Sequence, residues 1–165
     1  MRLFIASPAT IYDYDGLRHS FDAVLSGKWV EEENLHLTWY FAGELDSPDE
    51  IVQKLNAVEV PPEGMEIESL RSFSRTPQIL YASVSESFVA STIASFERAG
   101  FGMKGFKAHV TLCRVKRVLD RKSYEKGIKR YEGRVVGKIT PSIILYKSTL
   151  TPKGPIYEKL LEKGR

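Results

Sequence analysis

The apolar positions follow two patterns along the chain. Short, mostly apolar runs predict strands, and apolar residues at every third or fourth position predict helices. Residues 3–6 are uniformly apolar, as in a short buried strand. Between residues 11 and 25 the apolar side chains recur every three or four positions, as on one face of a helix, and Gly27 is expected to end that helix. Residues 35–42 are apolar and aromatic up to a glycine turn, which predicts a second strand.

Capping residues, prolines and glycines mark the elements that follow. Residues 47–50 (SPDE) have the form of a capping box with proline at the first helical position, and residues 51–58 give this helix an apolar face. Strands are expected at residues 65–73 and 79–84. A helix is expected after them and should stop at Gly100.

The last third of the chain continues in the same way. A strand is expected at residues 108–115, and Asp120 can cap the helix after it. Residues 135–145 supply strand material that Pro141 interrupts, because proline cannot donate to a strand ladder. A last, short strand is predicted at residues 157–161.

The predicted elements fall into two similar series. Each reads strand, helix, strand, helix, strand, and the middle strand of each carries a histidine, His36 or His109. These histidines lie at similar separations from Phe4 and Tyr81 in the preceding strands, and no linker-like composition divides the series. We therefore predict two lobes of a single domain that spans residues 1–165.

The two histidine strands share one motif. They read His36-Leu37-Thr38-Trp39 and His109-Val110-Thr111-Leu112. Because residues two apart on a strand point to the same face, each histidine should stand beside its threonine while the apolar neighbours face the core. Two lobes that face each other would then bring two imidazoles and two hydroxyls to one cleft.

This set of groups suits displacement at phosphorus. The reaction needs a base on the attacking oxygen and an acid on the leaving oxygen, and the unperturbed histidine pKa of about 6.5 allows either role near neutrality. Threonine hydroxyls would stabilise charge on the non-bridging oxygens. No metal or other cofactor is required, and a metallohydrolase is disfavoured because neither motif contains an acidic residue. A single such motif indicates only a surface or core histidine, whereas two at equivalent places indicate a catalytic pair.

Composition adds few constraints. The 165 residues include 24 basic and 21 acidic side chains, and this mildly basic balance permits a polyanionic partner. The single cysteine, Cys113, rules out an intramolecular disulfide, and the apolar run at the start is too short for a signal peptide or a membrane span. We expect a cytoplasmic monomer without a membrane segment. The scarcity of asparagine and glutamine resembles proteins from hot environments.

Further segments accompany the two motifs. They are MRLFIA at residues 1–6, WV at 29–30 leading to NLHLT at 34–38, Phe41 with Gly43-Glu44, HVTL at 109–112 ending at Arg114, and LYKS at 145–148 followed by Gly154 and Tyr157. With them the chain closely resembles the two-histidine phosphoesterase superfamily and, within it, the RNA 2',3'-cyclic phosphodiesterases, also called 2'-5' RNA ligases. The similarity runs over nearly the whole chain.

The resemblance implies an α+β, bilobal fold in which two pseudo-symmetric lobes line a central groove with antiparallel sheets. It also implies that His36 donates a proton to the departing 3'-oxygen and that His109 activates water. RNA ends with a 2',3'-cyclic phosphate, tRNA fragments among them, would then be hydrolysed to 2'-phosphomonoesters. Two alternatives stay open: the same site joins such an end to an RNA 5'-hydroxyl, or the protein binds RNA ends without turnover.

Tyr40, Lys104, Lys107 and Arg114 are weaker candidates for substrate binding. By strand alternation Tyr40 faces the cleft, where relatives often carry a basic residue, and it either stacks on a base or ribose or is a core tyrosine. Lys104 and Lys107 lie in or beside a glycine-flanked stretch before the second motif and could reach a phosphate. Alternation places Arg114 opposite His109 unless the strand bulges or ends there.

Three remaining features carry less weight. Cys113 has the parity of His109 and so could lie near the cleft, but it is expected to serve packing. His19 falls on the polar side of the first predicted helix and is left out of the site. Eight basic residues between positions 116 and 134 could steer RNA or form a solvated helix face.

Overall fold

A computed structural model describes residues 1–73 and 78–164 of the chain. Within these ranges it contains nine strands and four α-helices: β1 Arg2–Ile11, α1 Tyr14–His19, β2 Leu25–Trp29, β3 His36–Glu44, α2 Asp49–Leu55, β4 Glu66–Phe73, β5 Gln78–Val84, α3 Glu86–Arg98, β6 His109–Val118, α4 Arg121–Lys129, β7 Val135–Ile139, β8 Ser142–Thr151 and β9 Gly154–Gly164. The predicted α+β class is confirmed. None of the helices in these ranges has the length and apolar character of a membrane span.

All strand pairs are antiparallel, and they connect into one sheet. The order is β2-β6-β5-β4-β7-β1-β8-β9, and β3 pairs with both β1 and β6. Six strands therefore close into a circuit, β1-β3-β6-β5-β4-β7, from which β2 and the β8–β9 hairpin extend. The two predicted antiparallel walls are present as parts of this one connected sheet.

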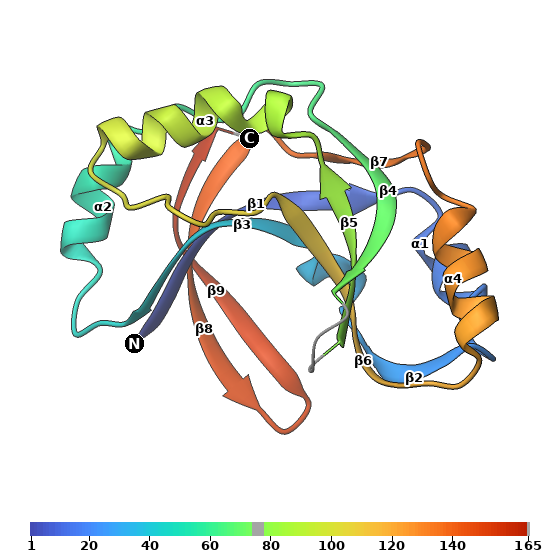
Figure 1. Ribbon diagram of the computed structural model, residues 1–165. Helices are drawn as coiled ribbons and strands as arrows, with labels where there is room; N and C mark the ends of the chain where they lie inside the picture. The colour runs from blue at the N-terminus through green and yellow to red at the C-terminus, as the bar shows by residue number, and fades with distance from the viewer. Residues whose placement is uncertain (74–77, 165) are drawn as a thin grey trace.

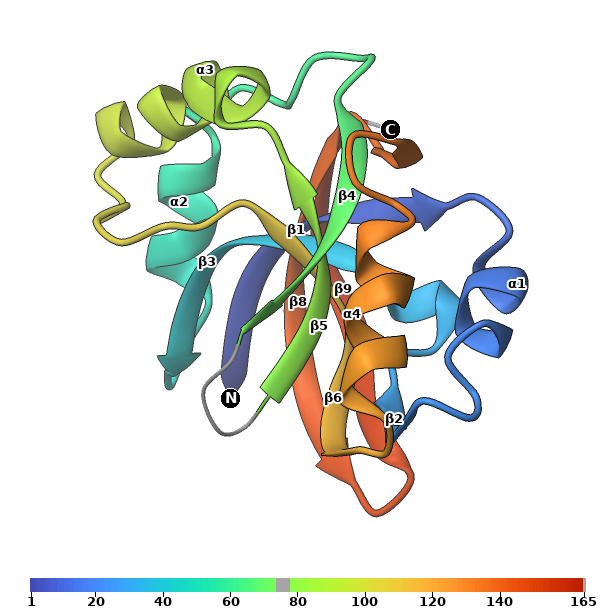
Figure 2. The same ribbon diagram turned by 45° about the vertical axis from the view of Figure 1, so that its right-hand side comes forward.

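The helices cover two flanks of the sheet (Figure 1). Both views show α2 beside α3 on one flank and α1 beside α4 on the other (Figure 2). Trp39 of β3 stacks on Phe96 of α3 at 5.7 Å between ring centroids, and the Tyr124 hydroxyl of α4 hydrogen-bonds Ser72 of β4. The lobes are therefore not consecutive halves of the chain: α3 packs on the His36 strand β3, whereas the Tyr14 hydroxyl of α1 donates to the Leu112 carbonyl of the His109 strand β6.

The predicted helix between residues 11 and 25 is mostly wrong. Only Tyr14–His19 is helical, Ile11 still pairs with Gly137 in the sheet, and Leu25 already begins β2. The apolar positions are buried as expected, apart from the half-buried Val24, because a short helix followed by turns also directs side chains at this spacing into the core. Gly27 does not end a helix: it lies in β2, where a Cβ atom would collide with the carbonyl oxygen of Arg114.

Other boundaries were predicted with mixed success. The Asp120 carboxylate caps α4 by accepting from the Ser123 amide at 3.2 Å, as expected. The capping box at residues 47–50 does not form, because Pro48 itself occupies the N-cap position and supplies no side-chain bond. The predicted strand at residues 157–161 is part of the much longer β9, which pairs with β8 along its length.

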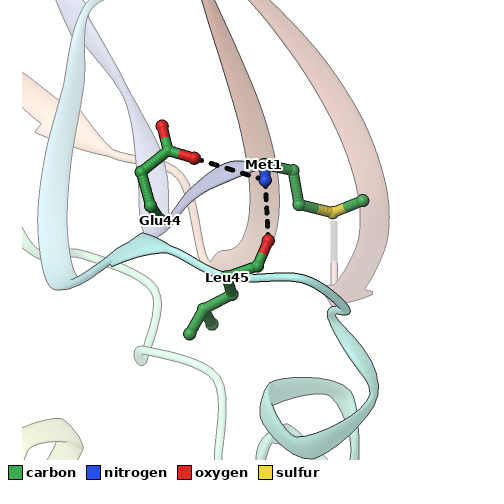
Figure 3. Close-up of polar contacts among 3 residues, drawn as sticks. All are labelled: Met1, Glu44 and Leu45. Carbon is green, nitrogen blue, oxygen red and sulfur yellow. Dashed lines mark hydrogen bonds and ion pairs between the residues drawn. The ribbon is translucent and has the colours of Figure 1, made fainter.

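The chain's first residue is tied to the end of β3 (Figure 3). The Met1 ammonium donates to the Leu45 carbonyl at 2.6 Å and lies 3.3 Å from a Glu44 carboxylate oxygen. Arg2 then pairs with Glu44 on one side of β1 and with Ser148 of β8 on the other. These contacts hold Arg2 at the border between the central circuit and the β8–β9 hairpin.

Closure of the circuit depends on a close approach at Gly137, which we expect to tolerate no side chain. A Cβ atom there would collide with the backbone of Thr10 and lie 3.1 Å from the Cα of Ile11. Gly137→Ala should therefore lower the free energy of unfolding by about 1–3 kcal/mol, as overpacking does. Denaturant unfolding followed by circular dichroism measures this.

Gly102→Ala is the matched control, because nothing lies within 4 Å of its Cβ position. Its stability should stay within about 0.5 kcal/mol of the parent. An unchanged unfolding midpoint for Gly137→Ala would show that the circuit does not need this contact.

Candidate active site

The two motifs meet at a single residue pair. Leu37 of β3 pairs with Val110 of β6, and both side chains are fully buried. Since side chains alternate along a strand, the residues on either side of this pair point away from the core. Those residues are His36, Thr38, His109 and Thr111, and all four line one cavity of about 610 Å³. The structure thus brings together the four groups that the motifs predict.

Both imidazoles are held in the same way. His36 Nδ1 donates to the Asn34 carbonyl at 2.6 Å, and His109 Nδ1 donates to the Lys107 carbonyl at 2.8 Å. A carbonyl only accepts, so Nδ1 carries a hydrogen in both rings. Each Nε2 is therefore free to accept a proton when its ring is neutral and to donate one when its ring is charged.

Aromatic rings pack against each histidine. His36 lies 5.3 Å from the Phe4 ring and 5.7 Å from the Tyr157 ring, between centroids. His109 lies 5.8 Å from Phe73 and 5.5 Å from Tyr81. These neighbours restrict the rotation of both imidazoles and so fix the direction of each Nε2.

The two histidines differ in their surroundings. Burial lowers the pKa of His36 from its usual value, although the bond to the Asn34 carbonyl opposes the shift; the nearby His109 charge lowers it further. His36 is therefore neutral near pH 7 when the groove is empty. Burial also raises the pKa of Tyr157 against the opposing charges of Arg114 and Arg2, so this hydroxyl stays protonated.

A β-bulge at the last residue of each motif changes which later side chains face the cavity. In β3, Ala6 pairs with Thr38 and Ile5 with Tyr40, so Trp39 is the extra residue. Tyr40 therefore packs against the core and against Phe101 at 5.0 Å, and Phe41 lines the cavity instead. The alternation that predicted Tyr40 in the cleft was wrong, because it assumed a regular strand.

The second motif shows the same irregularity. In β6, Tyr81 pairs with Thr111 and Leu80 with Cys113, which leaves Leu112 as the extra residue. Arg114 is thereby turned into the cavity, as expected only if the strand bulged. Cys113 is turned into the core, where burial raises its pKa to about 12, in keeping with the packing role expected for it.

Other predicted contributors lie outside the cavity. Lys104 and Lys107 do not line it, and the Lys107 ammonium lies over the Phe73 ring at 5.4 Å. Lys107 acts through its backbone carbonyl, which orients His109. No residue of the basic stretch 116–134 lines the cavity either, and His19 is exposed, with its Nδ1 at 2.8 Å from an Asp22 carboxylate oxygen.

Several cavity residues were not assigned to the site from the sequence. Most lie in the segments that carry the family resemblance, which marked them without giving a role: Arg2, Phe4, Trp29, Val30, Asn34, Phe41, Ser148, Gly154 and Tyr157. Lys28 and Lys153 had no sequence signal. Four cations, Arg2, Lys28, Arg114 and Lys153, face a single carboxylate, Glu31, and none of the four forms an ion pair within the described residues. The cavity therefore suits a polyanion.

A metal site is a poor fit to these side chains. Across residues 1–73 and 78–164, no three histidine, cysteine, aspartate or glutamate side chains gather closely enough to bind a metal ion together. What the cavity offers is a pair of imidazoles, a pair of hydroxyls and a surplus of cations. Such a set can protonate one oxygen of a phosphodiester, deprotonate another and stabilise the charge between them.

Comparisons with known proteins show which family the chain resembles. Residues 15–81 match the family model described as LigT like phosphoesterase. An Archaeoglobus fulgidus protein named RNA 2',3'-cyclic phosphodiesterase is 32% identical over 97% of this chain and 98% of its own length. An Aquifex aeolicus protein of the same name is 30% identical over 86% of this chain and 83% of its own.

Solved structures share the fold. A Thermus thermophilus protein superposes with a TM-score of 0.65 at 25% identity, over 99% of this chain and 97% of its own. Escherichia coli LigT in its apo form gives a TM-score of 0.67 at 18% identity, over 98% and 95%. The bilobal fold predicted from the sequence is thereby confirmed.

The hydrogen bonds of the two histidines lead to a spectroscopic prediction. Nitrogen-15 NMR of the free protein should show both neutral imidazoles in the Nδ1–H form, and His36 should titrate below the ordinary value of about 6.5. Because the pKa of His36 is lower in the folded than in the unfolded protein, burial of the neutral ring is fully compatible with folding above pH 6.5. The free energy of unfolding should therefore fall as the pH drops from 6.5 through the pKa of His36 in the folded protein. An Nε2–H tautomer at either residue would contradict the proposed orientation.

Proposed function

The chain belongs to the family of RNA 2',3'-cyclic phosphodiesterases among the LigT-like phosphoesterases, and from that premise we propose that it hydrolyses 2',3'-cyclic phosphate ends of RNA to 2'-phosphomonoesters. We propose further that the reaction needs no metal and that His36 and His109 are its acid and base. The observation that carries this proposal is the convergence of both His-x-Thr pairs around Leu37 and Val110.

The proposed reaction is an in-line displacement at phosphorus. Water attacks opposite the 3'-oxygen, and His109 Nε2 accepts its proton. The P–O3' bond breaks as His36 Nε2 donates a proton to O3', so the phosphate stays on O2'. Thr38 and Thr111 donate hydrogen bonds to the non-bridging oxygens, where negative charge grows in the transition state. The protons return to their starting places through solvent.

The lowered pKa of His36 makes this residue a stronger proton donor but also makes its charged form less abundant. A less basic imidazole is a stronger acid, which helps the departure of a poor leaving group such as an alkoxide. The cost is that His36 is neutral in the empty groove, so the reactive pair, charged His36 with neutral His109, is a minor form there. A phosphate anion bound beside His36 raises the pKa of that histidine and so increases this population.

Orientation of the cyclic phosphate needs an asymmetric contact, because the two motifs are nearly equivalent. The second position after each bulge supplies it: Arg114 faces the cavity on the His109 side, and Phe41 faces it on the His36 side. We propose that Arg114 pairs with a non-bridging oxygen and that this contact sets which ribose oxygen lies near His36. Both halves of the site come from one chain, so a monomer suffices.

Product analysis tests the proposed function. An oligoribonucleotide with a 2',3'-cyclic phosphate, such as a tRNA fragment, should be converted to the 2'-phosphomonoester in excess EDTA, as phosphorus NMR would show. A 3'-phosphate product would mean that the acid and base are assigned the wrong way round. Inhibition by EDTA that zinc or manganese reverses would contradict metal independence. Binding of the RNA end without turnover would reduce the protein to a binding module.

A further inference from the structure

The cavity extends past the four catalytic residues along the β2–β6 wall. Lys28 of β2 pairs with Arg114 of β6, beyond the bulge at Leu112. Both side chains therefore lie on the face of the sheet that also bears Thr111. Two residues separate Thr111 from Arg114, and one of them, Leu112, is the bulge. This level is therefore about two ladder steps from Thr111, roughly 6.5–7 Å. Such a separation is comparable to the spacing of successive phosphates in a single nucleic-acid strand.

The opposite wall of this outer part is the β8–β9 hairpin. Both views show the hairpin reaching beyond the body beside β2 and β6 (Figures 1 and 2). At its turn, Lys153 and Gly154 line the cavity. Lys28 reaches across to the turn: a Cβ atom on Gly154 would lie 3.4 Å from the Lys28 Nζ. Lys28 and Lys153 therefore line the same cavity from different strands, with the Lys28 ammonium beside the turn that carries Lys153.

Neither ammonium is neutralised by the protein. No carboxylate forms an ion pair with Lys28 or Lys153 within the described residues, and both residues are exposed. Like charges at one end of a cavity repel each other, and an anion bound between them removes that cost. The cyclic phosphate, which Thr38, Thr111 and Arg114 would hold, lies further in and leaves these two lysines without a ligand.

We propose that Lys28 and Lys153 form a second phosphate subsite, which binds the phosphodiester on the 5' side of the terminal nucleotide. This inference rests on the proposed function. Because the cyclic phosphate closes the 3' end of the substrate, the chain continues only in the 5' direction, and its next anion is this phosphodiester. The enzyme therefore acts more efficiently on oligonucleotide ends than on nucleoside 2',3'-cyclic phosphates, through a charge contact that tracks the backbone and ignores the base.

The subsite is tested by an experiment of the double-mutant-cycle type, in which the positive charges are removed from the protein and the negative charge is removed from the substrate, separately and together. The substrates are a nucleoside 2',3'-cyclic phosphate, a dinucleotide with the same end, and that dinucleotide with a neutral methylphosphonate linkage. The protein variants are Lys28→Gln/Lys153→Gln and, as a matched control, Lys122→Gln/Lys129→Gln on α4, which does not line the cavity. The measured quantity is kcat/KM.

The parent and the α4 control should prefer the charged dinucleotide over both other substrates by roughly 10-fold or more, the usual scale for a charged hydrogen bond. The Lys28→Gln/Lys153→Gln variant should lose this preference and keep its rate on the two other substrates within about twofold. For the parent, log kcat/KM on the charged dinucleotide should also fall more steeply with log salt than for this variant, by about 0.7 per phosphate contact.

Two results would overturn the subsite. Equal losses on all three substrates would mean that the lysines serve the cyclic phosphate itself, and no loss on any would mean that they are solvated surface charges. Failure of the proposed function looks different, since the parent would then turn over none of the three substrates.

Discussion

The pairing of Leu37 with Val110 is the contact on which the candidate site depends. Because the sheet alternates, burying these two side chains turns the histidines and threonines on either side of them into one cavity. The same pairing joins β3 to β6 and completes the six-strand circuit, so the geometry of the candidate site and the fold share one constraint. A site built at such a junction is held by the core rather than by loops.

A β-bulge at the last residue of each motif divides the cavity into two parts. The part before the bulges is nearly symmetric, and the part beyond them is not. Up to the bulges at Trp39 and Leu112, both strands present histidine and threonine in the same way. Beyond them, equivalent positions carry Phe41 on one side and Arg114 on the other, and β6 continues to Lys28 of β2. The near-equivalent part suits acid and base chemistry that runs in either direction, and the unequal part can orient a substrate.

The sequence predicted the central residues because nothing within His-x-Thr disturbs strand alternation. It failed at Tyr40 because the bulge is set by tertiary packing: the Trp39 ring lies between Phe96 and Phe106, at 5.7 and 5.5 Å, far along the chain. The helix predicted between residues 11 and 25 was too long, because a short helix followed by turns can bury the same positions as one continuous helix. The proposed roles of Lys28 and Lys153 depend on the turn of the β8–β9 hairpin lying beside β2, which no local pattern encodes.

The most direct test of the account compares His36→Ala and His109→Ala on cyclic phosphates with oxygen or sulfur at the 3' bridging position. A thiolate leaves without protonation, since thiols are far more acidic than alcohols. With oxygen, both variants should lose about 100- to 10,000-fold in rate, the usual contribution of general acid or base catalysis. With sulfur, only His36→Ala should recover most of the parent rate. Recovery by His109→Ala alone, or near-parent rates for either variant with oxygen, would contradict a site in which His36 is the acid and His109 the base.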